Sequence, residues 1–162
     1  MQPKLDRFRT AQDDLDSGFN SALEEIRTGR KRGHWIWYVF PQLSGLGGSS
    51  VSRTYAISGV AEAIDYVHDP ELRSRLLTIT TAVAEQLKSA RGTSVAAVMG
   101  SDIDARKLVS SLTLFGHVAG KLHADEGLQV YADLADIAHE VLAVAASQGY
   151  PPCRYTLEHL HD

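Results

Sequence analysis

The 162-residue chain contains a single cysteine, Cys153, and no long apolar run. One cysteine excludes an intramolecular disulfide framework and a zinc site built on several cysteine ligands. No stretch approaches the roughly 18 apolar residues that mark a membrane-spanning helix. The first ten residues, MQPKLDRFRT, lack the apolar core of a secretory signal. These absences predict a protein of the reduced cytoplasm that does not cross a membrane.

Acidic residues are absent from residues 26–61, although the chain has 20 of them. This window has a formal charge of +5, because it holds Arg27, Arg30, Lys31, Arg32 and Arg53. Since the whole chain carries −4, the remainder carries −9. Such a remainder repels a long polyanion and disfavours nucleic acid, whereas a small anion is repelled less. The window is therefore where a site for a small anion is expected.

The same window contains flat aromatic side chains and a flexible loop. The aromatic residues cluster in HWIWYVF at residues 34–40, and a Gly/Ser loop, SGLGGSS, follows at residues 44–50. Cations, aromatic faces and a Gly/Ser loop are components of anion and nucleotide pockets. A basic surface turn beside a buried aromatic strip is the alternative interpretation. Residues 34–40 fit either a short buried strand or a buried helical turn, and Pro41 ends both.

Most of the remaining sequence has apolar residues at helical spacing. Asp69-Pro70-Glu71 is a strong helix start, with an N-cap, a proline at the first helical position and an acidic first turn. Further helices are expected over residues 72–87, from 101 or 102 through 115, and over 127–146. The sequence predicts a mainly α fold, with residues 1–162 forming a single domain. Its architecture would be a compact bundle of about six to eight helices, with a buried Trp-rich segment and a Gly/Ser loop.

Short blocks along nearly the whole chain resemble one protein family. The blocks are LDRF (5–8), GRK (29–31), HWIWYVFPQ (34–42), GLG (45–47), YAI (55–57), HDPEL (68–72), Asp104 with Lys107, and SSLTLF (110–115). They are similar to the family catalogued as domain of unknown function 1810. Its members are small bacterial and fungal proteins, some of which carry the label calpastatin. The resemblance implies a mainly helical fold and supplies no activity.

Lys31 and His34 are the first candidates for contact with an anion. If their segment is helical they share a face; if it is extended, only one of them can line a pocket. Lys31 would bind phosphate, and His34 could act as a general acid or base because it titrates near neutrality. The alternative for His34 is a side chain that caps backbone carbonyls beside Trp35. Trp35 or Trp37 could stack on a base or sugar, although two Trp among apolar residues are more often core.

Other ligand-binding candidates lie downstream of the aromatic segment. Gln42 could bind an amide or base edge, Ser49 belongs to the Gly/Ser loop, and Tyr55 lies in a family-like block. The loop matches neither a P-loop nor a dinucleotide-binding pattern, so those nucleotide-binding enzymes are not indicated. A flexible loop without a ligand is the more frequent explanation of such glycines.

A second polar cluster is expected on a helix after residue 101. Asp104, Lys107 and Ser111 fall on one stripe of such a helix and could close a pocket. Asp104 is the candidate for acid–base catalysis, although most such carboxylates form salt bridges or caps. No ligand spacing typical of a metal site appears, and no cofactor is indicated.

Two functions remain open from the sequence. The first is binding or turnover of a small phosphorylated ligand, of nucleotide or ADP-ribose type, in a basic-aromatic pocket. The alternative is a non-catalytic module that docks an acidic partner through the basic stretch from Arg27 to Arg32. The identity of the ligand, the existence of a reaction, and the choice between monomer and homodimer are not determined by the sequence.

Overall fold

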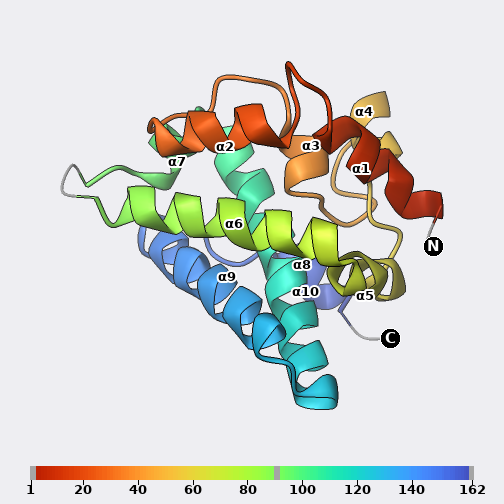
Figure 1. The fold of residues 1–162 in the computed structure, drawn as a ribbon. Coiled ribbons are helices and arrows are strands. Elements are labelled where there is room, and N and C mark those ends of the chain that lie inside the picture. Colours follow the sequence, from red (N-terminus) through yellow and green to blue (C-terminus); the bar gives the residue numbers. More distant parts are fainter. Residues whose placement is uncertain (1–2, 90–91, 161–162) are drawn as a thin grey trace.

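The computed structural model describes residues 3–89 and 92–160 (Figure 1). This part of the chain contains a 3-10 turn and ten α-helices, without a β-strand, so the predicted mainly α fold is confirmed. The elements are η1 (Pro3–Leu5), α1 (Asp6–Gln12), α2 (Phe19–Arg27), α3 (Ile36–Val39), α4 (Ser50–Thr54), α5 (Val60–His68), α6 (Pro70–Leu87), α7 (Val95–Met99), α8 (Asp102–Glu126), α9 (Gln129–Ser147) and α10 (Arg154–Glu158). The helices outnumber the expected six to eight because α3, α4, α7 and α10 are single turns of four or five residues.

Helix α8 lies at the centre of the packing. It contacts α5, α7, α9 and α10, while α6 packs against α2, α5 and α9. Figure 1 shows α6 crossing the molecule between α2 and α9, with α8 and α9 joined in a hairpin. Helix α8 is 25 residues long, and apolar residues such as Leu108, Leu112 and Phe115 recur along it at helical spacing and are fully buried. No helix of the described ranges is long and apolar enough to cross a membrane.

The helix starts follow the capping residues of the sequence. Asp69 accepts a hydrogen bond from Leu72 N at 2.9 Å, and Pro70 is the first residue of α6, as predicted. Ser101 caps α8 by accepting from Asp104 N at 3.0 Å. The last long helix begins two residues later than expected, at Gln129, because Gly127 adopts the left-handed conformation that ends α8.

The Trp-rich segment forms one short helix rather than a strand. Residues 31–35 are non-helical, α3 occupies residues 36–39, and Phe40 leaves the helix before Pro41. Trp35 and Phe40 are fully buried, so the segment belongs to the hydrophobic core. Its continuation makes an isolated parallel bridge between Leu43 and Ile57, which closes the Gly/Ser loop and α4 into one excursion.

Residues 150–160, called the C-terminal segment below, lie across α8 and reach the Gly/Ser loop. The Tyr150 hydroxyl donates to Asp102 Oδ1 at 2.6 Å. The Cys153 N–H donates to the buried Thr113 hydroxyl at 3.1 Å. The Tyr155 hydroxyl donates to the carbonyl oxygen of Ser44 at 2.8 Å. The segment thereby connects α8 to the loop that follows the Trp-rich segment.

Candidate functional site

Lys31 and Asp104 form a buried ion pair between the basic window and α8. Lys31 Nζ lies 2.7 Å from Asp104 Oδ2, with 5% of the lysine side chain and 18% of the aspartate side chain exposed. The ammonium group also donates to the carbonyl of Gly33 and lies 4.9 Å from the centre of the Trp35 ring. These contacts occupy the donors of the ammonium group. Its charge is therefore neutralised inside the protein.

Glu25 of α2 fixes the turn that carries Lys31. Its Oε1 accepts hydrogen bonds from Arg32 N at 2.7 Å, from Gly33 N at 2.8 Å and from Trp35 Nε1 at 2.9 Å. Burial opposes ionisation of this carboxyl, but the hydrogen bonds and the charge of Lys31 outweigh it and hold the pKa of Glu25 below its ordinary value. Since Trp35 is fully buried, it serves as core and presents no face to a ligand.

Lys107 and Trp37 form the outer edge of this cluster. Lys107 Nζ lies 5.0 Å from the centre of the Trp37 ring and 3.9 Å from Asp104 Oδ1. Trp37 is half-buried, and a quarter of the Lys107 side chain is exposed. The structure thus brings together five of the predicted site residues, and in this arrangement they satisfy one another.

His34 does not join this cluster. It is exposed, whereas Lys31 is buried, and the chain between them is non-helical. Within the described residues His34 makes no hydrogen bond, ion pair or ring contact with Asp104 or Lys107. The expected convergence of His34, Lys31 and Lys107 on one anion is therefore not seen in the contacts of these residues.

The remaining candidates are spread over other parts of the fold. Gln42 is half-buried beside the bridge that closes the Gly/Ser excursion. The Ser49 hydroxyl caps α4, and the Tyr55 ring packs 5.2 Å from that of Tyr38. Ser111 is fully buried in α8, where its hydroxyl has no hydrogen-bond partner in the described part of the chain. The described residues contain no group of three or more His, Cys, Asp or Glu side chains placed to hold a metal ion.

A polar groove of about 600 Å³ lies next to the cluster, where α2 ends beside the end of α6. We call it the basic groove; its lining residues are Arg27, Thr28, Gly29, Arg30, Gln86, Ser89 and Thr93. Gly29 has a φ of +109°, which favours glycine and turns the chain sharply after α2. Gln86 Nε2 donates to Arg27 O at 3.0 Å and ties the two walls together.

The arginines of the basic groove are not paired with a carboxylate in the part of the chain that the structure describes. Arg27 and Arg30 are exposed, and neither forms an ion pair within the described part of the chain. None of its described lining residues is acidic, while hydroxyl groups come from Thr28, Ser89 and Thr93. The Ser89 hydroxyl oxygen is buried without a hydrogen-bond partner. Guanidinium and hydroxyl donors without a nearby acid are the groups that bind phosphate or carboxylate oxygens.

Sequence reasoning identified only one wall of this groove. The sequence predicts Arg27 and Arg30 as part of a docking edge for an acidic partner, and it does not indicate Gln86, Ser89 or Thr93. No signal at positions 86–93 marks them, because their relation to Arg27 depends on the packing of α2 against α6.

Comparison with known proteins gives a family and one closely similar fold. Residues 2–139 match the family described as "Protein of unknown function (DUF1810)". A crystal structure of the conserved hypothetical protein Rv1873 from Mycobacterium tuberculosis is 35% identical in sequence, with a TM-score of 0.71. The match covers 97% of this chain and 96% of that one. No curated protein matches the chain at a significant level.

Proposed function

The chain belongs to the DUF1810 family, whose description assigns no activity, and we propose that it binds a small phosphorylated ligand in the basic groove. The observation that carries this proposal is the pair of exposed arginines, Arg27 and Arg30, in a groove without an acidic lining residue. Elsewhere in this protein, basic side chains such as Lys31 and Arg9 are paired with carboxylates. A pair of unopposed guanidinium groups is suited to bidentate binding of phosphate oxygens.

The dimensions and polarity of the groove support a small ligand. Its volume of about 600 Å³ lies within the range of about 300–1,000 Å³ that is usual for small-molecule sites. None of its described lining residues is aromatic. Trp35 is buried in the core, and the Trp37 ring contacts the ammonium group of Lys107. The phosphate groups, rather than a stacked base, would therefore determine affinity.

The position of the groove explains why arginines are needed there. The groove lies at the carboxyl-terminal ends of α2 and α6, where free carbonyl groups place partial negative charge. Arg27 is the last residue of α2 and Arg30 follows the turn at Gly29. Both guanidinium groups offset that partial charge and leave the groove cationic. An anion bound there would be held mainly by side chains, so arginine substitution is a direct test.

The test is titration calorimetry with pyrophosphate, ADP, ATP and ADP-ribose, with adenosine as the uncharged comparison. We expect the phosphorylated compounds to bind and adenosine not to bind. Arg27→Ala and Arg30→Ala should each weaken binding about tenfold, which corresponds to about 1.4 kcal/mol. Arg53→Ala is the matched control, because Arg53 is an exposed arginine of the same basic window that contacts the carbonyl of Gly48 away from the groove. Absence of binding by all four compounds, or equal affinities of the Arg27, Arg30 and Arg53 variants, would contradict the proposal.

Docking of an acidic partner is the second candidate. Its supporting observation is that Arg27, Arg30 and Arg32 are all exposed within six consecutive residues at and after the end of α2. An oligoglutamate peptide distinguishes docking of an acidic partner from binding of a phosphorylated ligand. Docking would need Arg32 as well as Arg27 and Arg30, and the affinity for the peptide should fall steeply as the salt concentration rises. Binding of the peptide that requires Arg32, without binding of the phosphorylated compounds, would favour the docking function.

A further inference from the structure

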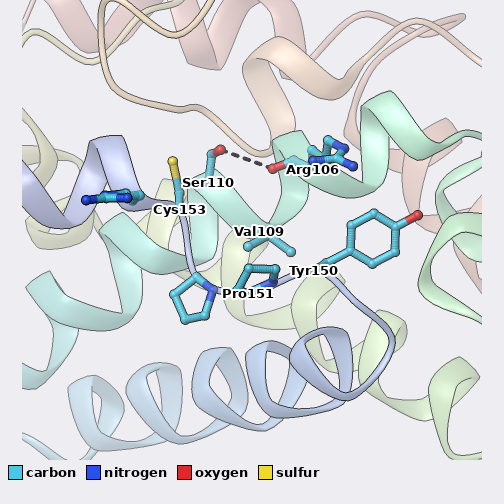
Figure 2. A pocket seen from close by; sticks show the side chains of 8 residues that line it. Arg106, Val109, Ser110, Tyr150, Pro151 and Cys153 are labelled. Atoms are coloured by element: carbon cyan, nitrogen blue, oxygen red, sulfur yellow. Dashed lines mark hydrogen bonds between the residues drawn. The ribbon is translucent and has the colours of Figure 1, made fainter.

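The cavity between α8 and the C-terminal segment differs from the basic groove in its charges (Figure 2). It has a volume of about 240 Å³, and its two cations are Arg106 and Arg154. Each arginine has a carboxylate on its own helix, Asp102 at 3.0 Å and Glu158 at 3.7 Å. Figure 2 also shows the Ser110 hydroxyl directed at the carbonyl oxygen of Arg106, to which it donates at 3.0 Å. The polar groups of this cavity therefore have partners within the protein, and the basic groove is the better place to seek a ligand.

The basic groove contains hydrogen-bond acceptors as well as donors. Arg27 and Arg30 supply only donors, because a guanidinium group has five N–H groups and no acceptor atom. Gln86 and Thr28 line the same groove and carry side-chain oxygen atoms that can accept. A fully ionised phosphate group has acceptors only, so it can bind the two arginines but offers nothing to these oxygen atoms.

The orientation of the Gln86 amide is fixed by its hydrogen bond to the end of α2. Gln86 Nε2 donates to Arg27 O at 3.0 Å. Because a carbonyl oxygen only accepts, the amide nitrogen must be the atom that faces it, which leaves Gln86 Oε1 on the other side. This oxygen lies over Gly29, where a Cβ would be 3.8 Å from it, and it accepts no hydrogen bond within the described residues. The free acceptor of Gln86 is thus placed beside the turn that joins Arg27 to Arg30.

The Thr28 hydroxyl is a second acceptor in the same turn. Thr28 ends α2, and its hydroxyl donates to Glu25 O at 3.0 Å. Since its one proton is used in this bond, Thr28 Oγ1 can only accept from a molecule in the groove. Thr28 is exposed, so this acceptor can be reached. A ligand that binds both arginines therefore meets two acceptors that need donors.

The charge of the groove favours hydroxyl groups over amines as these donors. Two guanidinium groups line it, and none of its described lining residues is acidic. An ammonium group on the ligand would be repelled by the guanidinium groups, whereas a neutral hydroxyl group donates without this cost. An aromatic ring would find no aromatic partner among the described lining residues. These properties together fit a compound with one phosphate and several hydroxyl groups.

We propose that the basic groove binds a small polyhydroxylated phosphate monoester of the glycerol-phosphate or sugar-phosphate class. The phosphate group binds Arg27 and Arg30, and nearby hydroxyl groups donate to Gln86 Oε1 and Thr28 Oγ1. Gln86 and Thr28 therefore determine specificity, because a compound without hydroxyl groups leaves both acceptors unpaired. This preference rests on the phosphate binding proposed above, which can hold without it.

The test compares two phosphate monoesters with the same three-carbon skeleton. Glycerol 3-phosphate carries two hydroxyl groups that n-propyl phosphate lacks. We expect titration calorimetry to show that glycerol 3-phosphate and ribose 5-phosphate bind about three- to tenfold more tightly than n-propyl phosphate, as neutral hydrogen bonds allow. The amine 2-aminoethyl phosphate should bind more weakly than glycerol 3-phosphate.

The outcomes separate this preference from phosphate binding itself. If n-propyl phosphate binds as tightly as both hydroxylated compounds, or if 2-aminoethyl phosphate binds most tightly, the preference is wrong while phosphate binding stands. If none of these compounds binds and pyrophosphate does not bind either, both proposals are wrong.

Variants assign the preference to its residues. Gln86→Met and Thr28→Val remove one acceptor each at similar side-chain volume, and each should lower the ratio of the glycerol 3-phosphate and n-propyl phosphate affinities about threefold. Thr28→Ser keeps the hydroxyl group and should keep the ratio. The matched controls are Gln129→Met and Arg106→Ala, which remove a glutamine that bonds Asp133 and an arginine of the other cavity. An unchanged ratio in both Gln86→Met and Thr28→Val, whether or not the two affinities fall together, would refute the proposal.

Discussion

The buried pair of Lys31 and Asp104 gives the sharpest prediction about stability. We consider Lys31→Ala, Asp104→Asn and a double variant, Lys31→Met with Asp104→Leu. Either single change leaves one charge or dipole without its partner where 5% of the lysine and 18% of the aspartate side chain are exposed. The double change removes both charges and fills the space with apolar groups. Comparison of the three therefore separates the cost of a broken pair from the net contribution of the pair.

The magnitude follows from the burial of the pair. Breaking a fully buried ion pair costs about 3–5 kcal/mol. Lys31→Ala should cost less than the upper end of this range for two reasons. Asp104 is partly exposed, and a second cation, Lys107, lies 3.9 Å from its carboxylate. We expect Lys31→Ala to lower the free energy of unfolding by about 3 kcal/mol, or the midpoint of thermal unfolding by about 6–12 °C for a chain of this size. The double variant should recover most of this, less the ~0.3–1 kcal/mol that an acidic residue contributes in the first turn of α8.

The assay is urea unfolding monitored by circular dichroism. The dependence of the unfolding free energy on urea concentration is fitted with one common slope for all variants whose transitions are equally steep. Arg32→Ala is a suitable control because the Arg32 side chain is exposed and makes no hydrogen bond, ion pair or ring contact in the described part of the chain. It should stay within about 0.5 kcal/mol of the parent. If both single variants lose less than about 1 kcal/mol, the pair does not hold the turn to α8 and the reasoning fails.

Three further predictions concern the same region. The lowered pKa of Glu25 contributes stability that is present above its unfolded-state pKa and is lost as the pH falls through the folded value, so Glu25→Gln should flatten the acid limb of the stability–pH curve below about pH 4.3. Gly100→Ala should cost about 1–3 kcal/mol in urea unfolding, because Gly100 has a φ of +84° and a Cβ would lie 2.7 Å from Lys31 O; a neutral result would contradict this contact. Ser101→Ala should cost about 1 kcal/mol by losing the cap of α8, whereas Ser101→Asp should retain it, and thermal unfolding distinguishes the two.

The sequence predicted the helices well where the signal is local. Asp69 and Pro70 begin α6, and Ser101 begins α8, because capping depends on residues within one turn. The sequence does not distinguish strand from helix in the Trp-rich segment, because the six consecutive apolar and aromatic residues 35–40 show no period. Tertiary packing decided it, since α3 packs against α1 and α8.

The candidate site was predicted less well, for a physical reason that Lys31 illustrates. The acid-free window describes neighbours along the chain, whereas electrostatic energy depends on neighbours in space. Asp104 comes from α8, and Glu25 lies directly before the window; both neutralise or fix its basic turn. Arg27 and Arg30 have no carboxylate partner in the described part of the chain, as Arg32 and Arg53 have none, and the charge count alone does not show which of these cations line a groove.

The hydrogen bond from Tyr155 to the carbonyl of Ser44 has a consequence for the order in which the protein acquires its structure. Its two residues are 111 positions apart. At a synthesis rate of about 5–20 residues per second, Ser44 leaves the ribosome's catalytic centre about 6–22 s before Tyr155 is added. During that interval the Gly/Ser loop cannot form its hydrogen bond with Tyr155, because Tyr155 has not yet been synthesised. The loop is therefore among the last parts of the nascent chain to become fixed, and a stalled ribosome would carry an otherwise helical protein with this loop still open to proteases.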